Sequence, residues 1–176
     1  MSGISSGNRA VRPALGGVMA AASLAFLWLA SITPSGRLGV AAAAGLFPMA
    51  AVLAAGRSTG YLCWGASGIL GLILIPDKGV SLMYLGFLGL YPVVKSLIES
   101  LRRLPLEWLL KLTYFNGALT VFWFLFRHIF MPHPPAWLAD NTFLLYPAGN
   151  VIFVCYDFGL SQLIGLFRRR FRFGRR

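Results

Sequence analysis

The sequence predicts an all-α integral membrane protein: a six-helix transmembrane bundle with an amphipathic cytoplasmic segment between the fourth and fifth spans. Composition is the first observation, since 57% of the 176 residues are hydrophobic and 12% are charged. Soluble domains are about 45–50% apolar and about 25% charged. The second observation is that the apolar residues form long runs with basic residues between them. A soluble core of this size cannot bury so much apolar surface, and a disordered chain needs the opposite composition.

Six apolar runs are candidate spans, because a bilayer-spanning helix needs about 20 mostly apolar residues. They cover residues 14–32, 38–56, 59–75, 80–92, 106–126 and 141–167. The first run resembles a signal peptide, but it is longer than a signal core and other runs follow at once, so we expect an uncleaved helix. The chain 1–176 is therefore expected to form a single polytopic membrane domain.

The basic residues predict the orientation of the spans. If the N-terminus is cytoplasmic, the inner segments hold twelve Lys and Arg residues and the outer loops hold three. The outer three are Arg37, Lys78 and Arg127. Cytoplasmic loops of membrane proteins carry an excess of Lys and Arg, so we expect both termini to be cytoplasmic.

The segment 93–104 is expected to be an amphipathic helix with a basic polar side at the cytoplasmic surface. Its apolar residues recur at helical spacing: Val93, Val94, Leu97, Ile98, Leu101 and Leu104. Its polar residues fill the other face: Lys95, Ser96, Glu99, Ser100, Arg102 and Arg103. It is either a separate helix that begins after Pro92 or a continuation of the fourth span through a proline kink. Its role is either a membrane-surface connector or a docking platform for a partner.

The formal net charge is +11, which in a soluble protein would suggest nucleic-acid binding. Six arginines lie in the C-terminal tail 168–176, with phenylalanines between them. Aromatic residues among arginines are also found where proteins stack on nucleic acid. Because this tail follows a predicted span, we expect it to contact anionic lipid of the bilayer instead. Nucleic acid is not an expected partner.

Ionisable side chains inside a predicted span are costly, so each one is a functional hypothesis. Asp157 in the sixth span and Asn116 in the fifth lie about ten residues from the cytoplasmic ends of their helices, and Lys111 lies slightly closer to that end. If the two helices pack together, Lys111, Asn116 and Asp157 form an intramembrane polar cluster, with Tyr114 as a further member. Such a cluster would hold the helices in register. Substrate or ion handling by Asp157, and access of Asp157 to water, are the alternatives.

A second polar pattern lies in the outer half of the sixth span. Tyr146 and Asn150 are one turn apart, and Asn150 and Asp157 are two turns apart, so all three share a helix face. Together with Trp123 of the fifth span, Tyr146 and Asn150 are the candidate substrate-binding residues. Pro147 frees a backbone carbonyl within this helix, which often marks a kink beside a cavity. The alternative interpretation is a set of hydrogen bonds between helices.

The first span carries Gly17, Ala21 and Ala25 at fourfold spacing. Small residues at this spacing allow another helix to approach closely. They are the candidate partner-binding residues, and packing within the protein itself is the alternative.

The sequence shows no motif for catalysis. It has no phosphate-binding loop with the Walker pattern, no nucleophile elbow and no zinc-protease helix. His128 and His133 lack cysteine or carboxylate ligands at a matching spacing, so we expect neither a metal nor a cofactor. We therefore do not expect an enzyme; a lipid-modifying enzyme would depend on Asp157 alone.

A chain with six spans, both ends inside and small residues at fourfold spacing in its first helix resembles the substrate-specific S components of energy-coupling-factor transporters. The stretches 85–116 and 149–157 are also similar to bacterial membrane proteins of this size. The resemblance implies a protein of the bacterial cytoplasmic membrane that binds a vitamin or similar micronutrient toward its outer side. It also implies a transmembrane coupling protein, docked on the first helix, and ATPase subunits that power uptake.

The chain is also similar to the small rod-shape-determining membrane proteins, which are non-transporting scaffolds for wall synthesis. Under the uptake hypothesis we expect an outer-half cavity lined by Trp123, Trp137, Tyr146 and Asn150. Under the scaffold hypothesis we expect a filled interior and a working surface on 93–104. Both hypotheses stay open at the level of sequence.

Overall fold

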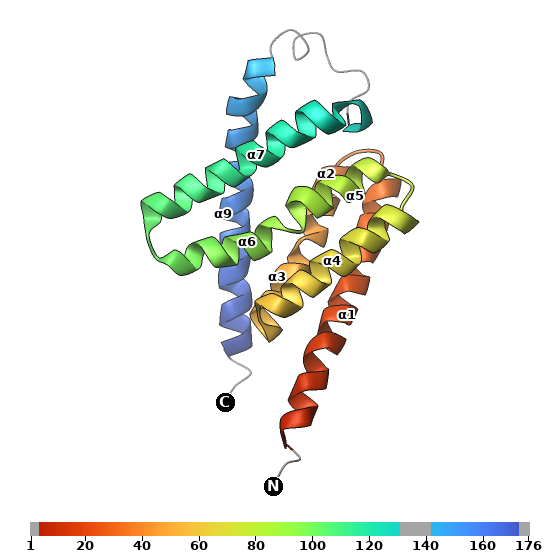
Figure 1. The fold of residues 1–176 in the computed structure, drawn as a ribbon, viewed down its shortest axis with the longest axis vertical. Helices are drawn as coiled ribbons and strands as arrows, with labels where there is room; N and C mark the ends of the chain where they lie inside the picture. The colour runs from red at the N-terminus through yellow and green to blue at the C-terminus, as the bar shows by residue number, and fades with distance from the viewer. Residues whose placement is uncertain (1–3, 131–141, 173–176) are drawn as a thin grey trace. The chain divides into compact units, whose positions relative to one another are not determined.

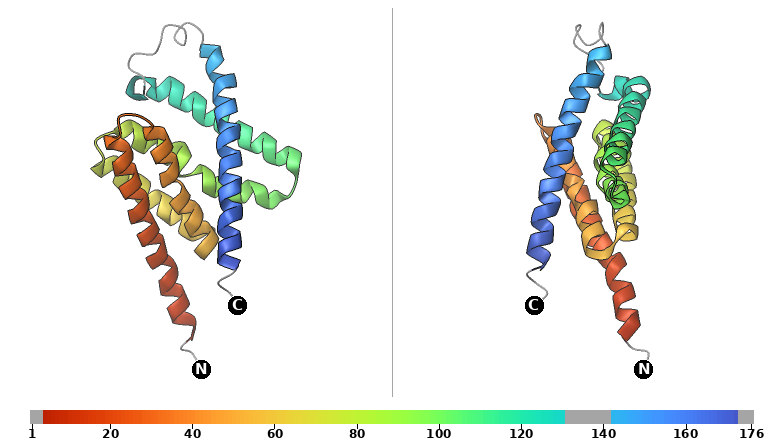
Figure 2. Two further views of the ribbon diagram at one scale, coloured as in Figure 1. Left: turned by 180° about the vertical axis from the view of Figure 1, so that it is seen from behind. Right: turned by 90° about the vertical axis from the view of Figure 1, so that its left-hand side faces the viewer.

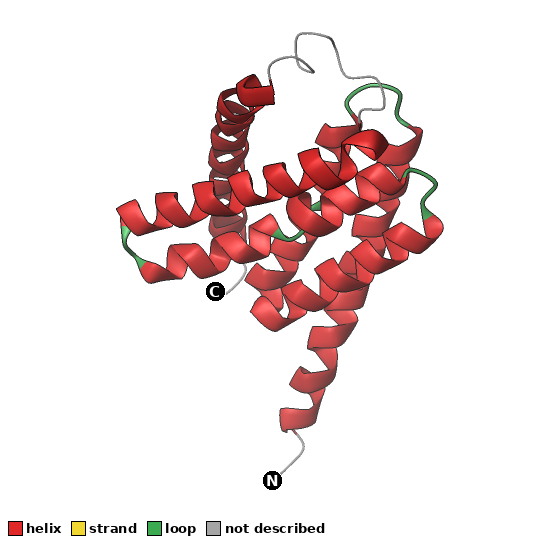
Figure 3. Cartoon of the chain, turned by 45° about the horizontal axis from the view of Figure 1, so that its top comes forward, coloured by secondary structure: helices red, strands yellow, loops and turns green. Residues whose placement is uncertain are grey.

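The computed structural model describes residues 4–130 and 142–172, and among these the side chains of residues 13–124 and 143–166. The described backbone consists of helices joined by turns and short loops, without a strand (Figures 1 and 3). The all-α prediction is therefore confirmed. The chain divides into two compact units, Met1–Glu107 and Trp108–Arg176.

Four helical stretches are long and apolar enough to cross a membrane: Pro13–Ile32, Arg37–Ala55, Lys78–Leu101 and Leu145–Leu166. The predicted third and fifth spans are also helices, α4 (Arg57–Leu74) and α7 (Leu104–Phe130), but they do not belong to this set. Both are more polar, since α4 is rich in glycine and hydroxyl residues and α7 contains Lys111 and Asn116. The six-span count therefore depends on how those polar groups are satisfied.

The first unit is built around α1 (Ile4–Ile32), which contacts α2 (Arg37–Ala44), α3 (Leu46–Ala55) and α4 (Figure 2). The inward face of α1 is narrow, because Gly16, Ala20 and Ser23 lie on it and allow close approach of the neighbouring helices. The next turns of this face bury Leu27 and Ala30 completely. Small residues thus set the packing distance, as is typical of helices that associate within lipid.

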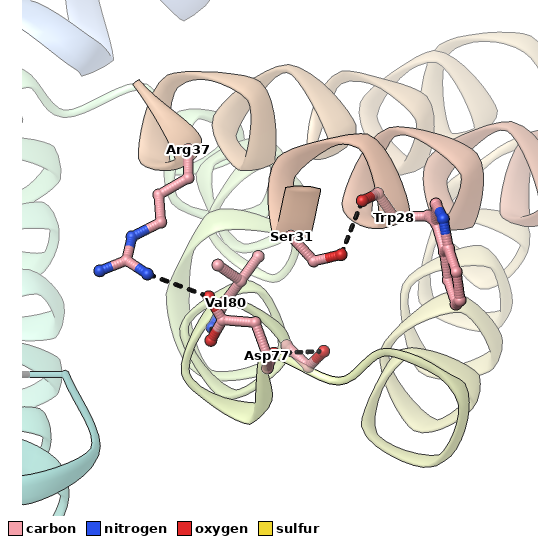
Figure 4. Close-up of polar contacts among 6 residues, drawn as sticks. Trp28, Ser31, Arg37, Asp77 and Val80 are labelled. Atoms are coloured by element: carbon pink, nitrogen blue, oxygen red, sulfur yellow. Dashed lines mark hydrogen bonds and ion pairs between the residues drawn. The ribbon is translucent and has the colours of Figure 1, made fainter. Parts of the chain in front are cut away.

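The loops at one end of this unit are tied together by charge (Figure 4). Arg37 at the start of α2 forms an ion pair of 3.2 Å with Asp77, which also accepts a hydrogen bond from the Val80 backbone nitrogen and caps α5 (Lys78–Met83). The Lys78 ammonium donates to the carbonyls of Leu72 and Ile75 at the end of α4. A cation at a helix C-terminus satisfies carbonyls that have no partner within the helix.

The predicted boundary between the fourth span and the amphipathic segment is wrong. After α5 the chain forms a π-helical turn, η1 (Tyr84–Leu88), and a new helix, α6 (Tyr91–Ile98), begins before residue 93. Pro92 lies in the first turn of α6, where its missing N–H is not needed. A short 3-10 helix, η2 (Glu99–Leu101), follows, and Leu104 already belongs to α7.

The faces predicted for the segment 93–104 are also wrong in part. Lys95 is fully buried, whereas Leu97 and Leu101 are exposed. Burial of the lysine is tolerated because its ammonium lies 2.9 Å from the Glu99 carboxylate, one turn further along the same segment. Lys95 therefore leaves the predicted polar face, whereas Arg102 and Arg103 remain exposed on it.

The second unit contains most of α7, a short 3-10 helix η3 (Thr142–Leu144) and the long helix α9 (Leu145–Arg172). The predicted sixth span, 141–167, corresponds to η3 and most of α9. Helix α9 continues through Arg168–Arg170, so the first part of the predicted basic tail is helical. Residues 131–141 and 173–176 lie outside the described residues.

Candidate functional site

The first unit contains two interrupted helices, and each interruption has a cause in the sequence. The stretch Arg37–Ala55 breaks at Gly45 between α2 and α3, and the stretch Lys78–Leu101 breaks at η1 and the following turn. Proline has no N–H, so Pro48 and Pro92 cannot donate to the carbonyls of Ala44 and Leu88, four residues earlier. Both breaks therefore release backbone oxygens that need other partners.

The released Ala44 carbonyl accepts a hydrogen bond of 3.0 Å from the Ser23 hydroxyl on α1. The Ser23 oxygen also lies 2.7 Å from the Tyr84 hydroxyl, and the Tyr84 hydroxyl lies 2.7 Å from the Ser67 hydroxyl on α4. Each hydroxyl has one hydrogen, which Ser23 gives to Ala44 and Ser67 gives to the Cys63 carbonyl at 2.7 Å, so Tyr84 donates to one of the two serines. This buried chain of hydroxyls connects α1, α2, α4 and η1.

The backbone around the second break is held by other groups. A Cβ on Gly45 would lie 2.2 Å from the Leu88 carbonyl oxygen, so only glycine leaves room for the backbone of one broken helix against the other. The π-helical turn closes with a hydrogen bond from the Gly89 nitrogen to the Tyr84 carbonyl. The Leu85 carbonyl in that turn accepts from the Trp64 indole nitrogen at 2.9 Å.

We call this meeting point of the two breaks the junction; its members are Ser23, Ala44, Gly45, Ser67, Tyr84 and Leu88. Its polar groups are hydroxyl and carbonyl oxygens, which suit hydrogen-bond donors and small cations better than anions. Interrupted helices are tolerated in membranes where neighbouring helices satisfy the freed groups, and transporters place substrate and ion sites at such interruptions. The junction is thus the strongest candidate site in the first unit.

None of the junction residues was predicted from the sequence as a site residue. Ser23 and Ser67 are single hydroxyls among apolar or small residues, and Tyr84 gives no periodic signal. The usable signal was Pro48 inside the second apolar run, together with Pro92 inside the fourth. Each proline marks a carbonyl four residues earlier that a neighbouring helix must satisfy.

The polar groups predicted in the fifth and sixth spans meet in the second unit. The Lys111 ammonium lies 3.1 Å from the Asp157 carboxylate, and their side chains are only 7% and 5% exposed. Asn116 and Asn150 exchange two amide hydrogen bonds, of 3.1 and 3.0 Å. These four residues form the first two of three layers between α7 and α9.

The third layer joins the hydroxyls of Thr120 and Tyr146 at 2.9 Å. We call the three layers the polar ladder; it consists of Lys111–Asp157, Asn116–Asn150 and Thr120–Tyr146. Numbers rise along α7 as they fall along α9, so the two helices are antiparallel. The rings of Phe115 and Phe153 stack with centroids 4.6 Å apart and add an apolar contact to the same helix pair.

The ladder rearranges the two patterns that the sequence predicted separately. Asp157 pairs with Lys111, while Asn116 pairs with Asn150 rather than with Asp157. The predicted substrate-binding groups of Tyr146 and Asn150 are thereby bonded to α7. Trp123 is buried on α7, and its indole has no hydrogen bond among the described residues.

The predicted partner-binding residues face outward. Gly17, Ala21 and Ala25 are exposed, whereas Gly16, Ala20 and Ser23, one or two positions away, face the neighbouring helices. A Cβ on Gly17 would meet no atom within 4 Å. The small-residue face is therefore not used for packing within the described part of the chain.

No metal-binding group of three or more His, Cys, Asp or Glu residues exists among the described residues. The side chains of His128, His133 and Trp137 lie outside the described part. Comparison with protein-family models, with curated proteins and with solved structures finds no match. The candidate functional features of the described chain are the junction, the polar ladder and the outward face of α1.

Proposed function

We propose that the chain is a membrane transport component that takes up a small solute through a site at the junction. The observation that carries this proposal is the contact between two helix breaks inside one unit, Gly45 against the Leu88 carbonyl. Each interruption of a helix loses backbone hydrogen bonds and so costs stability. Two interruptions in contact are therefore more readily explained by a function at this point than by packing alone. In transporters, such breaks create the polar backbone groups that meet substrate or coupling ion.

The proposal includes six spans with both termini cytoplasmic, in a bacterial cytoplasmic membrane. Helices α4 and α7 count as spans because their polar groups are satisfied by neighbours. Ser67 of α4 bonds within the junction, and Lys111, Asn116 and Thr120 of α7 bond to α9. Pairing of this kind lowers the cost of polar groups in lipid.

The chemistry of the junction limits the class of solute. Ser23, Ser67 and Tyr84 are fully buried and bonded to one another, so the proposal requires a solute to open the junction and replace these bonds. The exposed hydroxyl and carbonyl oxygens then favour a solute with hydrogen-bond donors or a positive charge. In the energy-coupling-factor arrangement, the exposed Gly17, Ala21 and Ala25 would face a coupling protein, and separate ATPase subunits would supply the energy. The bilayer itself, with anionic lipid at the Arg-rich tail, completes the proposed partners.

A non-transporting membrane scaffold is the second candidate, and the polar ladder is the observation that favours it. Tyr146 and Asn150 were the expected lining of an outer-half cavity, yet their hydroxyl and amide bond to Thr120 and Asn116. A filled interior in the second unit is what a scaffold requires. The two candidates differ in whether the junction accepts a solute.

A thermal-shift screen of the purified full-length chain in neutral detergent tests the transport proposal. The probes are cationic solutes, polyols and amide- or amine-bearing vitamins, with carboxylate vitamins as a comparison. We expect at least one donor-rich or cationic solute to raise Tm, and Ser23→Ala with Ser67→Ala to abolish that shift. Thr120→Val, which removes one hydroxyl from the ladder, should leave the shift unchanged.

Two results would contradict the proposal. One is the absence of any stabilising solute together with recovery of only wall-synthesis or division proteins in a mild-detergent pull-down from native membranes; this favours the scaffold. The other is a solute shift that survives the serine replacements but disappears in Asn150→Leu. In that case the site lies at the ladder, as the sequence first indicated.

A further inference from the structure

The turn between α6 and α7 carries an unusual combination of exposed groups. Arg102 and Arg103 are exposed, and neither guanidinium has a hydrogen bond or ion pair among the described residues. The flanking Leu101 and Leu104 are 47% and 73% exposed. Exposed leucines are unfavourable in water and unpaired cations are costly in the bilayer centre, but both suit the boundary between headgroups and acyl chains.

The acidic residue of this segment does not cancel that charge. Glu99 forms an ion pair of 2.9 Å with the buried Lys95. A third arginine, Arg57 at the start of α4, donates to the Ser96 carbonyl at 3.0 Å and so lies beside the end of α6. The region therefore holds a local excess of positive charge from two segments distant in sequence.

The backbone of the turn is also special. Arg102 has a φ of 54°, in the left-handed region, and is the only described residue other than glycine with positive φ. Residues without a glycine's freedom adopt this conformation uncommonly and at some cost. Here it ends η2, and both arginines lie in the short turn before α7.

We propose that this basic turn, made of Arg57, Leu101, Arg102, Arg103 and Leu104, docks on anionic phospholipid headgroups. The planar guanidinium fork matches a phosphate with two hydrogen bonds, and the leucines enter the acyl boundary beside it. Nucleic acid is a poorer occupant, because exposed leucines offer no surface on which bases stack. The inference depends on a membrane location but not on transport. It therefore still holds if no solute binds at the junction.

A local probe in the full-length chain tests this surface. Ser100 is exposed beside the turn, Cys63 is buried and Cys155 is exposed. A chain with Ser100→Cys and Cys155→Ser therefore takes an environment-sensitive fluorophore at position 100. It is reconstituted into phosphatidylcholine vesicles with increasing phosphatidylglycerol, and the fluorescence gives the lipid fraction for half response.

We expect phosphatidylglycerol to shift the fluorescence of the wild-type turn. Loss of one arginine near an anionic surface weakens binding about 5-fold, so Arg102→Gln with Arg103→Gln should weaken docking about 30-fold and leave less than half of the response at phosphatidylglycerol fractions that saturate the wild-type turn. Arg175→Gln with Arg176→Gln removes the same charge from the tail and should leave this local response unchanged. If the Gln pair does not fold, Arg102→Lys with Arg103→Lys should retain most of the response, and added salt should weaken it.

Three results would overturn the proposal: no response to phosphatidylglycerol in the wild-type chain, an unchanged response in the folded Gln pair, or an equal response to inorganic phosphate added to phosphatidylcholine vesicles. The last result would assign the turn to a soluble phosphate instead of a lipid headgroup.

Discussion

Both units contain polar groups among apolar helices, and they satisfy the hydrogen bonds of these groups in different ways. In the first unit the backbone itself is interrupted, and single hydroxyls such as Ser23 satisfy the released carbonyls. In the second unit α7 and α9 are regular where they face each other, and side chains pair in three layers. Side-chain pairs hold two helices in register, whereas broken backbones leave segments that open at lower cost. The proposed function therefore places movement and solute contact in the first unit and rigidity in the second.

The largest effect is expected when the ion pair of the ladder is broken. Asp157→Ala leaves the Lys111 ammonium buried without its carboxylate, which destabilises by about 3–5 kcal/mol. We expect lower abundance in membranes and a lower Tm in detergent, with ligand affinity of the surviving protein unchanged. Replacing both partners, Lys111→Met with Asp157→Leu, should restore most of the loss. Normal abundance of Asp157→Ala with abolished solute binding would transfer the functional site to the second unit.

Gly45→Val should be next in size, because its side chain meets the Leu88 carbonyl where even a Cβ would lie at 2.2 Å. Overpacking of this kind costs about 1–3 kcal/mol. The matched control is Gly117→Ala in α7, where a Cβ meets no atom within 4 Å and helix propensity favours alanine by up to about 1 kcal/mol. Thermal unfolding of both variants in the same detergent measures the difference. Equal behaviour would mean that the two breaks are not in contact.

Tyr84→Phe removes the hydroxyl at the centre of the junction and keeps the ring that packs on Gly89. Leaving the Ser23 and Ser67 hydroxyls with one partner fewer should cost about 1–3 kcal/mol. Tyr61→Phe is the control, since the Tyr61 hydroxyl has no hydrogen bond among the described residues. Denaturation midpoints should separate the two variants, and a Tyr61→Phe loss as large as that of Tyr84→Phe would refute the role of the hydroxyl chain.

Single uncharged layers of the ladder should matter less. Thr120→Val and Asn150→Leu each remove one interhelical hydrogen-bonding group, and such bonds in membrane proteins average about 0.6 kcal/mol, with a maximum of about 1.7 kcal/mol. The double variant shows whether the layers act independently, because their contributions should then add. A loss in Thr120→Val that matches the loss in Asp157→Ala would indicate that the ladder acts as one unit.

Ala21→Leu should have the smallest effect on stability, because Ala21 is exposed and packs on nothing in its own unit. We expect an unchanged Tm and a weaker complex with a membrane partner on a native gel. Gly17→Leu should also weaken the complex, and its higher helix propensity should raise the free energy of unfolding by up to about 1 kcal/mol. An intact complex with both variants would remove the outward face of α1 as a docking surface.

The sequence predicted regular features better than interruptions. Apolar runs located the helices, and the depth of Asp157, Asn116 and Lys111 in their spans anticipated that α7 and α9 share polar contacts. The pairing of Asn116 with Asn150 was not predicted, because register between two helices depends on side-chain geometry that a single sequence does not contain. Each side chain had several partners within reach.

The junction and the segment 93–104 show why the rest could not be predicted. Helical periodicity within 93–104 placed Lys95 on the polar face, yet the packing of α6 buries Lys95 together with Val93 and Ile98. The burial is possible because the Glu99 carboxylate lies 2.9 Å from the ammonium, a pairing that periodicity alone does not indicate. The role of a hydroxyl such as that of Ser23 cannot be predicted from the sequence until the backbone carbonyl to which it donates is known.

Hydrogen exchange measured by mass spectrometry on the reconstituted full-length chain tests the contrast between the units most directly. Broken segments expose backbone amides through local opening, whereas paired regular helices exchange only through larger unfolding. We predict faster deuterium uptake in peptides covering 42–49 and 84–92 than in those covering 110–121 and 146–158, and slowing of the first set alone when a stabilising solute binds. Faster uptake in the ladder peptides, or protection of those peptides by the solute, would contradict the assignment of movement and solute contact to the first unit.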